Sequence, residues 1–126
     1  MNKKLIVCYI GQDCEEFVEM SLNSVKDIAD HIIFVDGGSK DGTINILDLK
    51  YNFVPVPLDN NLSKDELKHF DKILIHRRYE HEHKGANGRA RNYYLEFIKK
   101  YFDGEWALIL DPDEVVENPQ DIRTII

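Results

Sequence analysis

Two carboxylates stand directly after an apolar stretch late in the sequence. Asp111 and Asp113 follow residues 106–110, which read WALIL. Hard carboxylate oxygens in such a turn suit Mn²⁺ or Mg²⁺, and the lack of neighbouring His or Cys disfavours Zn²⁺. A lone D-x-D is also a common turn sequence, but its position after a fully apolar strand favours metal binding. We therefore predict a metal and diphosphate site at Asp111 and Asp113.

A second polar segment covers residues 36–43 and reads DGGSKDGT. Asp36 can accept hydrogen bonds from ribose hydroxyls or a base N–H, while Gly37 permits close backbone approach. A dinucleotide-binding fold would use this position in the same way. That fold also needs a glycine-rich phosphate loop, whereas residues 11–16 contain one glycine and three acids. NAD is therefore disfavoured as the ligand.

Two basic residues, Arg89 and Arg91, form the third candidate motif. Arg89 and Arg91 begin a predicted helix, where helix N–H groups and guanidinium groups can together hold a diphosphate. A solvated basic helix end is the alternative, and it is the stronger rival for Arg89. His81 and His83 lack the i, i+4 spacing of a helical metal site, so we predict a polar surface loop there.

The elements that position these residues alternate along the chain. Residues 4–10 form a continuous apolar run, as in a strand buried on both faces, and an amphipathic helix is predicted from Val18 to Ala29. Further strands are predicted at residues 31–35, 52–56, 71–77 and 105–110, and further helices at 43–51, within 58–70, from about 90 to 103, and from about 118. This alternation predicts a Rossmann-like, open, mostly parallel α/β sheet flanked by helices. Ligands of such sheets bind beyond the carboxyl ends of the strands, where the polar loops described above would meet.

The composition limits the class of protein. With 126 residues, 43% hydrophobic and 31% charged, we expect one folded domain covering residues 1–126. The net charge of −7 argues against nucleic acid as a partner, so an anionic ligand needs a metal ion or a local basic patch. We expect Cys8 and Cys14 to be reduced thiols in a cytoplasmic protein, because the sequence shows no CxxC, signal peptide or membrane span. Peripheral contact with the cytoplasmic face of a membrane stays open.

Three segments together resemble family 2 of the glycosyltransferases, which have the A-type (GT-A) fold. Residues 29–43 are similar to the family's "DxGSxDGT" segment, Arg91-Asn92 to its "RN" helix start, and Asp111 to Glu114 to its "DxDE" motif. The order and spacing of the three are more specific than any one alone. The resemblance runs from Leu5 to about Val116, with residues 58–70 outside it.

The resemblance implies a transferase that moves a sugar from a UDP- or GDP-type donor to a glycan, lipid or protein acceptor. It places the following residues around the nucleoside: Tyr9, Ile10, Gly11, Asp36 and Gly37. It places Arg91 near the base or phosphate, Asp111 near the ribose or sugar, and Asp113 on the metal. A divalent cation would neutralise the charge that builds on the leaving diphosphate.

Two departures from the family pattern shape the expectation. Asp13-Cys14-Glu15 stands where the family often has Asn-Glu-Glu. Family members also continue past the acidic motif into an acceptor-binding half that supplies the general base, whereas 12 residues follow Glu114 here. We therefore expect the catalytic base to lie outside this chain, which would be a donor-binding fragment or would work in an abbreviated or homo-oligomeric form.

Two alternatives remain at the level of sequence. Residues 111–115 also fit the D-x-D-x-V string of haloacid-dehalogenase-type phosphotransferases, in which Asp111 would be a nucleophile. We rank this lower because that motif normally opens its domain and because residues 36–43 would have no role. The other alternative is a nucleotide-sugar-binding module without catalysis.

Overall fold

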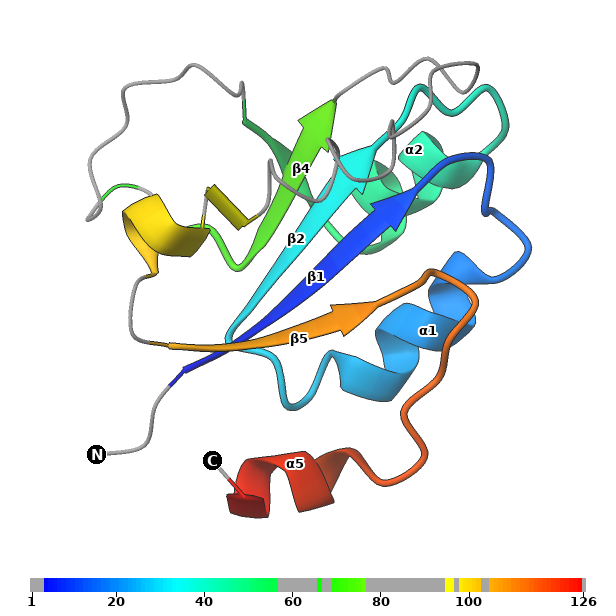
Figure 1. The fold of residues 1–126 in the computed structure, drawn as a ribbon. Coiled ribbons are helices and arrows are strands. Elements are labelled where there is room, and N and C mark those ends of the chain that lie inside the picture. Colours follow the sequence, from blue (N-terminus) through cyan, green and yellow to red (C-terminus); the bar gives the residue numbers. More distant parts are fainter. Residues whose placement is uncertain are drawn as a thin grey trace, which may run out of the picture.

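A five-stranded parallel sheet forms the centre of the fold. The computed structural model of the protein describes residues 4–56, 66, 69–76, 95–96, 98–102 and 105–125. Within these residues the strand order is β3-β4-β2-β1-β5 and every neighbouring pair is parallel; the arrows of the labelled strands fan out in Figure 1. The strands are β1 (Leu5–Gly11), β2 (His31–Asp36), β3 (Val54–Pro55), β4 (Lys72–His76) and β5 (Trp106–Leu110). The predicted parallel α/β sheet is confirmed.

The helices follow the strands in the expected order. They are α1 (Val18–Val25), α2 (Thr43–Asn45), which continues into the π-helical turn η1 (Ile46–Lys50), and α5 (Pro119–Ile125). Residues 98–101 are helical too, as predicted for that region. Helix α1 ends before the predicted Ala29, because the N–H groups of Ile28 and Ala29 both donate to the carbonyl of Val25 and close a turn. The helix predicted within residues 58–70 falls almost wholly outside the described residues. Of the residues described in this range, only Glu66 is helical.

Both faces of the sheet are buried along β1 and β2, as the apolar run of β1 predicted, whereas Trp106 and Ile109 on β5 are exposed. Alternate side chains of β1 point to opposite faces. Tyr9 belongs to the cluster that packs under α1 and η1, whereas Cys8 belongs to the cluster that includes Tyr101 and Phe102. Tyr9 and Cys8 are both fully buried. Strand β1 is therefore packed on both faces, and its carboxyl end gives the following loop a well-defined starting point.

The strand order reverses at β1, which pairs with β2 on one side and β5 on the other. In an open α/β sheet, the point where the order reverses leaves a crevice beyond the carboxyl ends of the two strands concerned. Here that crevice lies between the loop after Gly11 and the turn after Leu110. The fold thus brings the acidic motif beside the first loop, although more than ninety positions separate them in sequence.

Helix α5 lies near the amino ends of the strands, away from this crevice (Figure 1). The Arg123 guanidinium donates to Asp30 Oδ2 at 2.6 Å, and the same oxygen accepts the Leu5 N–H at 2.8 Å. Burial tends to raise the pKa of Asp30, but the hydrogen bonds from Leu5 and Arg123 outweigh it and lower the pKa. Among the described residues, no helix is long and apolar enough to cross a bilayer.

Candidate functional site

A pocket opens at the crevice between β1 and β5. Its volume is about 380 Å³, within the range of about 300–1,000 Å³ found for small-molecule sites. One wall comes from the end of β1 and the loop to α1, and the other from the turn after β5. The lining residues are Ile10, Gly11, Gln12, Asp13, Cys14, Phe17, Asp111, Pro112 and Asp113. The structure therefore brings four of the predicted site residues, Ile10, Gly11, Asp111 and Asp113, to one pocket.

Backbone hydrogen bonds shape the acidic turn. The Asp111 N–H donates to Glu114 Oε1 at 2.7 Å, and the Glu114 N–H donates to the Asp111 carbonyl at 2.9 Å. Further along, the Val116 N–H donates to Ser24 Oγ on α1 at 3.0 Å. Pro112 is buried, while Asp111 and Asp113 are exposed. The turn is thus fastened to itself and to α1, and both predicted metal ligands are left accessible.

The described lining of the pocket is acidic. It includes the acidic residues Asp13, Asp111 and Asp113 and no basic residue. Within the described part of the chain, no three His, Cys, Asp or Glu side chains are grouped so as to hold a metal. Two carboxylates still suit Mg²⁺ or Mn²⁺, because such ions are commonly held by one or two carboxylates together with substrate phosphates and water. The residues present therefore fit a metal that arrives with a diphosphate.

Asp36 shapes its own turn. Its side chain is 1% exposed, and Oδ2 accepts the N–H groups of Gly38 and Ser39, each at 3.0 Å. The Ser39 hydroxyl donates to Oδ1. Gly38 has a φ of 104°, which few side chains tolerate. The sequence interpretation missed this structural role. The D-x-G-S pattern could have indicated it, because an Asp at the start of a turn often accepts hydrogen bonds from the backbone N–H groups that follow.

Asp36 and Gly37 nevertheless lie beside the pocket. Asp36 is the strand partner of Gly11, and the Gly37 N–H donates to the Gly11 carbonyl at 2.9 Å. These two residues are therefore next to a lining residue without being part of the described lining themselves. Their contact with a nucleoside remains a prediction.

A set of reciprocal hydrogen bonds joins the loop after β1 to the loop after β2, and we call it the loop clasp. In one direction, side-chain carboxylates accept backbone N–H groups. Asp13 Oδ1 accepts those of Lys40 at 2.6 Å and Asp41 at 3.2 Å. Glu15 Oε2 accepts that of Gly42 at 3.1 Å. Asp13 has a φ of 51°, a conformation that Asp adopts more readily than most residues.

In the other direction, side chains of the second loop accept backbone N–H groups of the first. These bonds join Asp13 N–H to Ser39 Oγ at 2.9 Å, Cys14 N–H to Thr43 Oγ1 at 2.9 Å, and Glu15 N–H to Asp41 Oδ2 at 3.2 Å. Burial tends to raise the pKa of Asp41, but hydrogen bonds from the Thr43 hydroxyl and from backbone N–H groups outweigh it and lower the pKa. The "SKDGT" residues thus serve first to hold the two loops together.

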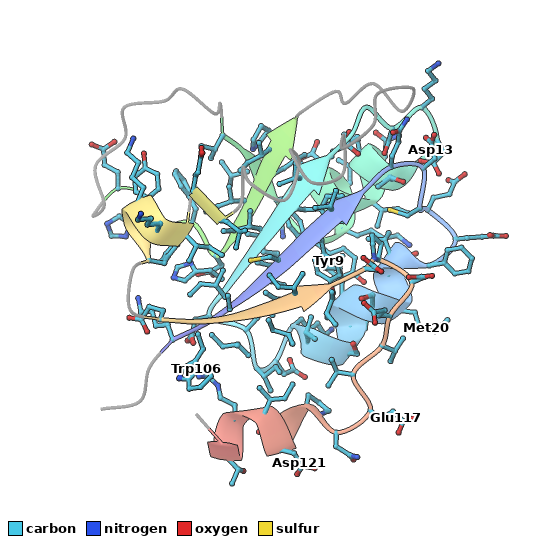
Figure 2. All side chains as sticks on the ribbon, in the orientation of Figure 1. Tyr9, Asp13, Met20, Trp106, Glu117 and Asp121 are labelled. Atoms are coloured by element: carbon cyan, nitrogen blue, oxygen red, sulfur yellow. The ribbon has the colours of Figure 1, made fainter. Side chains whose placement is uncertain are left out.

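The remaining predicted site residues fall elsewhere. The Tyr9 side chain is fully buried, and its hydroxyl lies 2.8 Å from Ser21 Oγ, between the sheet and α1 (Figure 2). It is not in the described lining, because side-chain alternation turns it toward the core, so that Tyr9 can offer only its backbone. Burial raises its pKa to about 12. Arg91, Arg89 and the histidines at 81 and 83 lie outside the described residues.

Both cysteines are free and buried. Cys14 lines the pocket, and burial raises its pKa to about 11. Burial likewise raises the pKa of Cys8, in the core of the sheet, to about 12. Both side chains are therefore neutral thiols at physiological pH, and neither has the lowered pKa of a nucleophilic cysteine.

No protein-family model and no curated protein sequence matches the chain. Solved structures do match it. The crystal structure of S. aureus TarS, a GT-A glycosyltransferase, aligns with 98% of this chain at a TM-score of 0.64 and 22% identity. The structure of TarS 1-349 in complex with UDP aligns with 97% at a TM-score of 0.63 and 20% identity. The chain thus has a GT-A fold, and it spans 19% and 31% of those two chains.

Proposed function

We propose that this chain binds the donor of a family 2 glycosyltransferase: a nucleotide diphosphate sugar, held together with Mn²⁺ or Mg²⁺. The observation that carries the proposal is the position of Asp111 and Asp113 in the pocket between β1 and β5. A GT-A fold supports it over a haloacid-dehalogenase-type reaction. TarS 1-349 has been crystallised with UDP, which makes UDP the first nucleotide to test.

The electrostatics of the pocket give the metal a specific role. A diphosphate would be repelled by three carboxylates unless a cation neutralised them first. Asp113 and Asp111 would hold the metal, whose positive charge would offset the charge of the diphosphate and of the leaving group. Gly11 and Ile10 would line the path of the nucleoside beside Asp36 and Gly37. Arg91 would add positive charge near the base or phosphate.

A thermal-shift experiment tests the proposal. The protein would be melted with UDP or GDP in Mn²⁺, in Mg²⁺ and in EDTA. We expect stabilisation by a nucleotide only when a metal is present, of about 2.7 kcal/mol at a nucleotide concentration one hundred times the Kd. Equal stabilisation in EDTA would remove the metal from the proposal, and no stabilisation by any nucleotide would remove the donor site.

A second measurement tests whether the chain catalyses a reaction of the bound sugar donor. Hydrolysis of a UDP-sugar should be followed beside its binding. Metal-dependent binding with slow release of UDP would support an enzyme, whereas tight binding with no release would support a donor-binding module without catalysis.

A further inference from the structure

Two carboxylates of the loop clasp, those of Asp13 and Glu15, bind the backbone of the neighbouring loop. Asp13 Oδ1 and Glu15 Oε2 together accept three backbone N–H groups of residues 40–42. These contacts lie on exposed loops, where water could replace them. Charge-assisted bonds from N–H to carboxylate are nevertheless stronger than those between neutral groups, so they favour one loop conformation over others.

Gly42 shows how closely the two loops fit. A Cβ atom at this position would overlap Oε2 of Glu15. A larger residue at position 42 would displace this flexible carboxylate and disturb its bond to the N–H of residue 42. Together with the three bonds running in the opposite direction, these contacts tie the two loops to each other at several points.

The clasp is continuous with the parts of the proposed donor site that would meet the nucleoside. Asp13 lines the pocket and also holds the second loop. That loop begins at Asp36 and Gly37, and the Gly37 N–H donates to the Gly11 carbonyl. The loop is thus tied at its start to Gly11 through Gly37, and at its end to the loop after β1 through Glu15. Both ties therefore help to hold Asp36 and Gly37 in their place beside the pocket.

We propose that Asp13 and Glu15 are positioning residues, which hold the loop of residues 36–43 in the conformation that receives the nucleoside. The inference rests on the proposed function. It gives a role to the Asp13-Cys14-Glu15 segment, where the chain departs from the pattern it resembles. Neither carboxylate needs to touch the nucleotide for this role, because each acts through the backbone of the second loop.

Glu15 offers the cleaner variant because it is outside the described pocket lining. Glu15→Ala removes the acceptor for Gly42, whereas Glu15→Gln keeps a side-chain oxygen there. The matched control is Glu16→Ala, which removes the same charge from the next residue, an exposed one that takes no part in the clasp. Each variant would be titrated with UDP and, separately, with pyrophosphate, both in Mn²⁺.

We expect Glu15→Ala to weaken UDP binding about tenfold, from the loss of a charge-assisted hydrogen bond. Pyrophosphate binding should stay unchanged, since pyrophosphate would meet only the metal and the acidic turn. Glu15→Gln should recover most of the UDP affinity, and Glu16→Ala should bind like the parent. Amide hydrogen exchange at residues 40–42 should quicken in Glu15→Ala alone.

The outcomes separate the two proposals. If the parent binds UDP with Mn²⁺ and Glu15→Ala binds it equally well, the positioning role is overturned and the donor site stands. Equal losses for UDP and pyrophosphate would also overturn it, because they would point to general destabilisation. A parent that binds no nucleotide with metal would overturn the proposed function itself, and the inference with it.

Discussion

A Cβ atom at Gly11 would lie 2.7 Å from Cγ of Pro112, so the loop after β1 and the acidic turn meet at a position that has no room for a side chain. The ring of Phe34 closes the other side, with its Cζ at 2.8 Å. Pro112 is the residue between the two proposed metal ligands. The packing of the β1 end therefore sets where that turn sits.

Gly11→Ala should consequently disturb both stability and metal binding. Relief of the overlap requires Pro112 or Phe34 to move, and overpacking of this kind costs about 1–3 kcal/mol. Urea unfolding would measure the change in the free energy of unfolding, and calorimetry would measure Mn²⁺-dependent UDP binding. A variant with parental stability and parental affinity would show that the turn is placed by other contacts.

Asp113→Asn should abolish the metal-dependent part of nucleotide stabilisation while leaving the fold intact. Asp113 is exposed, so its replacement removes no buried contact. Asp121→Asn is the control, since Asp121 is exposed on α5, far from the pocket (Figure 2), and loses the same charge. Thermal shifts with UDP and Mn²⁺ would compare the two. Equal loss of stabilisation in both would indicate a general charge effect in place of a metal ligand.

Asp36→Ala should lower stability, because a side chain that is 1% exposed and accepts three hydrogen bonds from its own turn would be lost. We expect a cost of about 1–3 kcal/mol. The variant therefore cannot test nucleoside contact by itself. Asp36→Asn keeps an oxygen acceptor and is the better probe. If Asp36→Ala unfolds at the same urea concentration as the parent, the turn does not depend on this carboxylate.

Alkaline pH should destabilise the protein through Cys8. Its pKa is about 12 in the fold, against an ordinary value of 9.0. Above pH 9 the thiol ionises in the unfolded chain but not in the folded one, so unfolding becomes easier as the pH rises from 9 to about 12. The free energy of unfolding, measured across that range, should fall less steeply in Cys8→Ala. Parallel curves for the two proteins would contradict the assignment to Cys8.

The pattern of residues was sufficient to predict the order of the strands and helices and the position of the acidic turn after β5. The apolar run of β1 and the alternation of elements predicted a parallel sheet, and that sheet brings Asp111 and Asp113 to the pocket. The role of Asp36 in its own turn was not predicted, since a carboxylate before two glycines looks the same whether it binds a ligand or its own backbone.

The loop clasp could not be read from the sequence for a different reason. Its bonds join residues 26 to 29 positions apart, and they depend on the register in which Gly11 pairs with Asp36. A shift of one residue in that register would separate Asp13 from Lys40. Local composition carries no information about such a register, which the packing of both sheet faces determines.

The pairing of β5 with β1 also bears on how the protein is made. The Lys4 N–H donates to Glu105 Oε2 across 101 positions of sequence, and the two strands run side by side from there. Contacts between residues so far apart in sequence slow folding, because the loop between them must close before the contacts can form. During synthesis, the residues of β1, β2 and β4 would leave the ribosome well before those of β5. The two walls of the pocket would thus meet last, and a ligand present during synthesis would find no complete site until residue 113 had emerged.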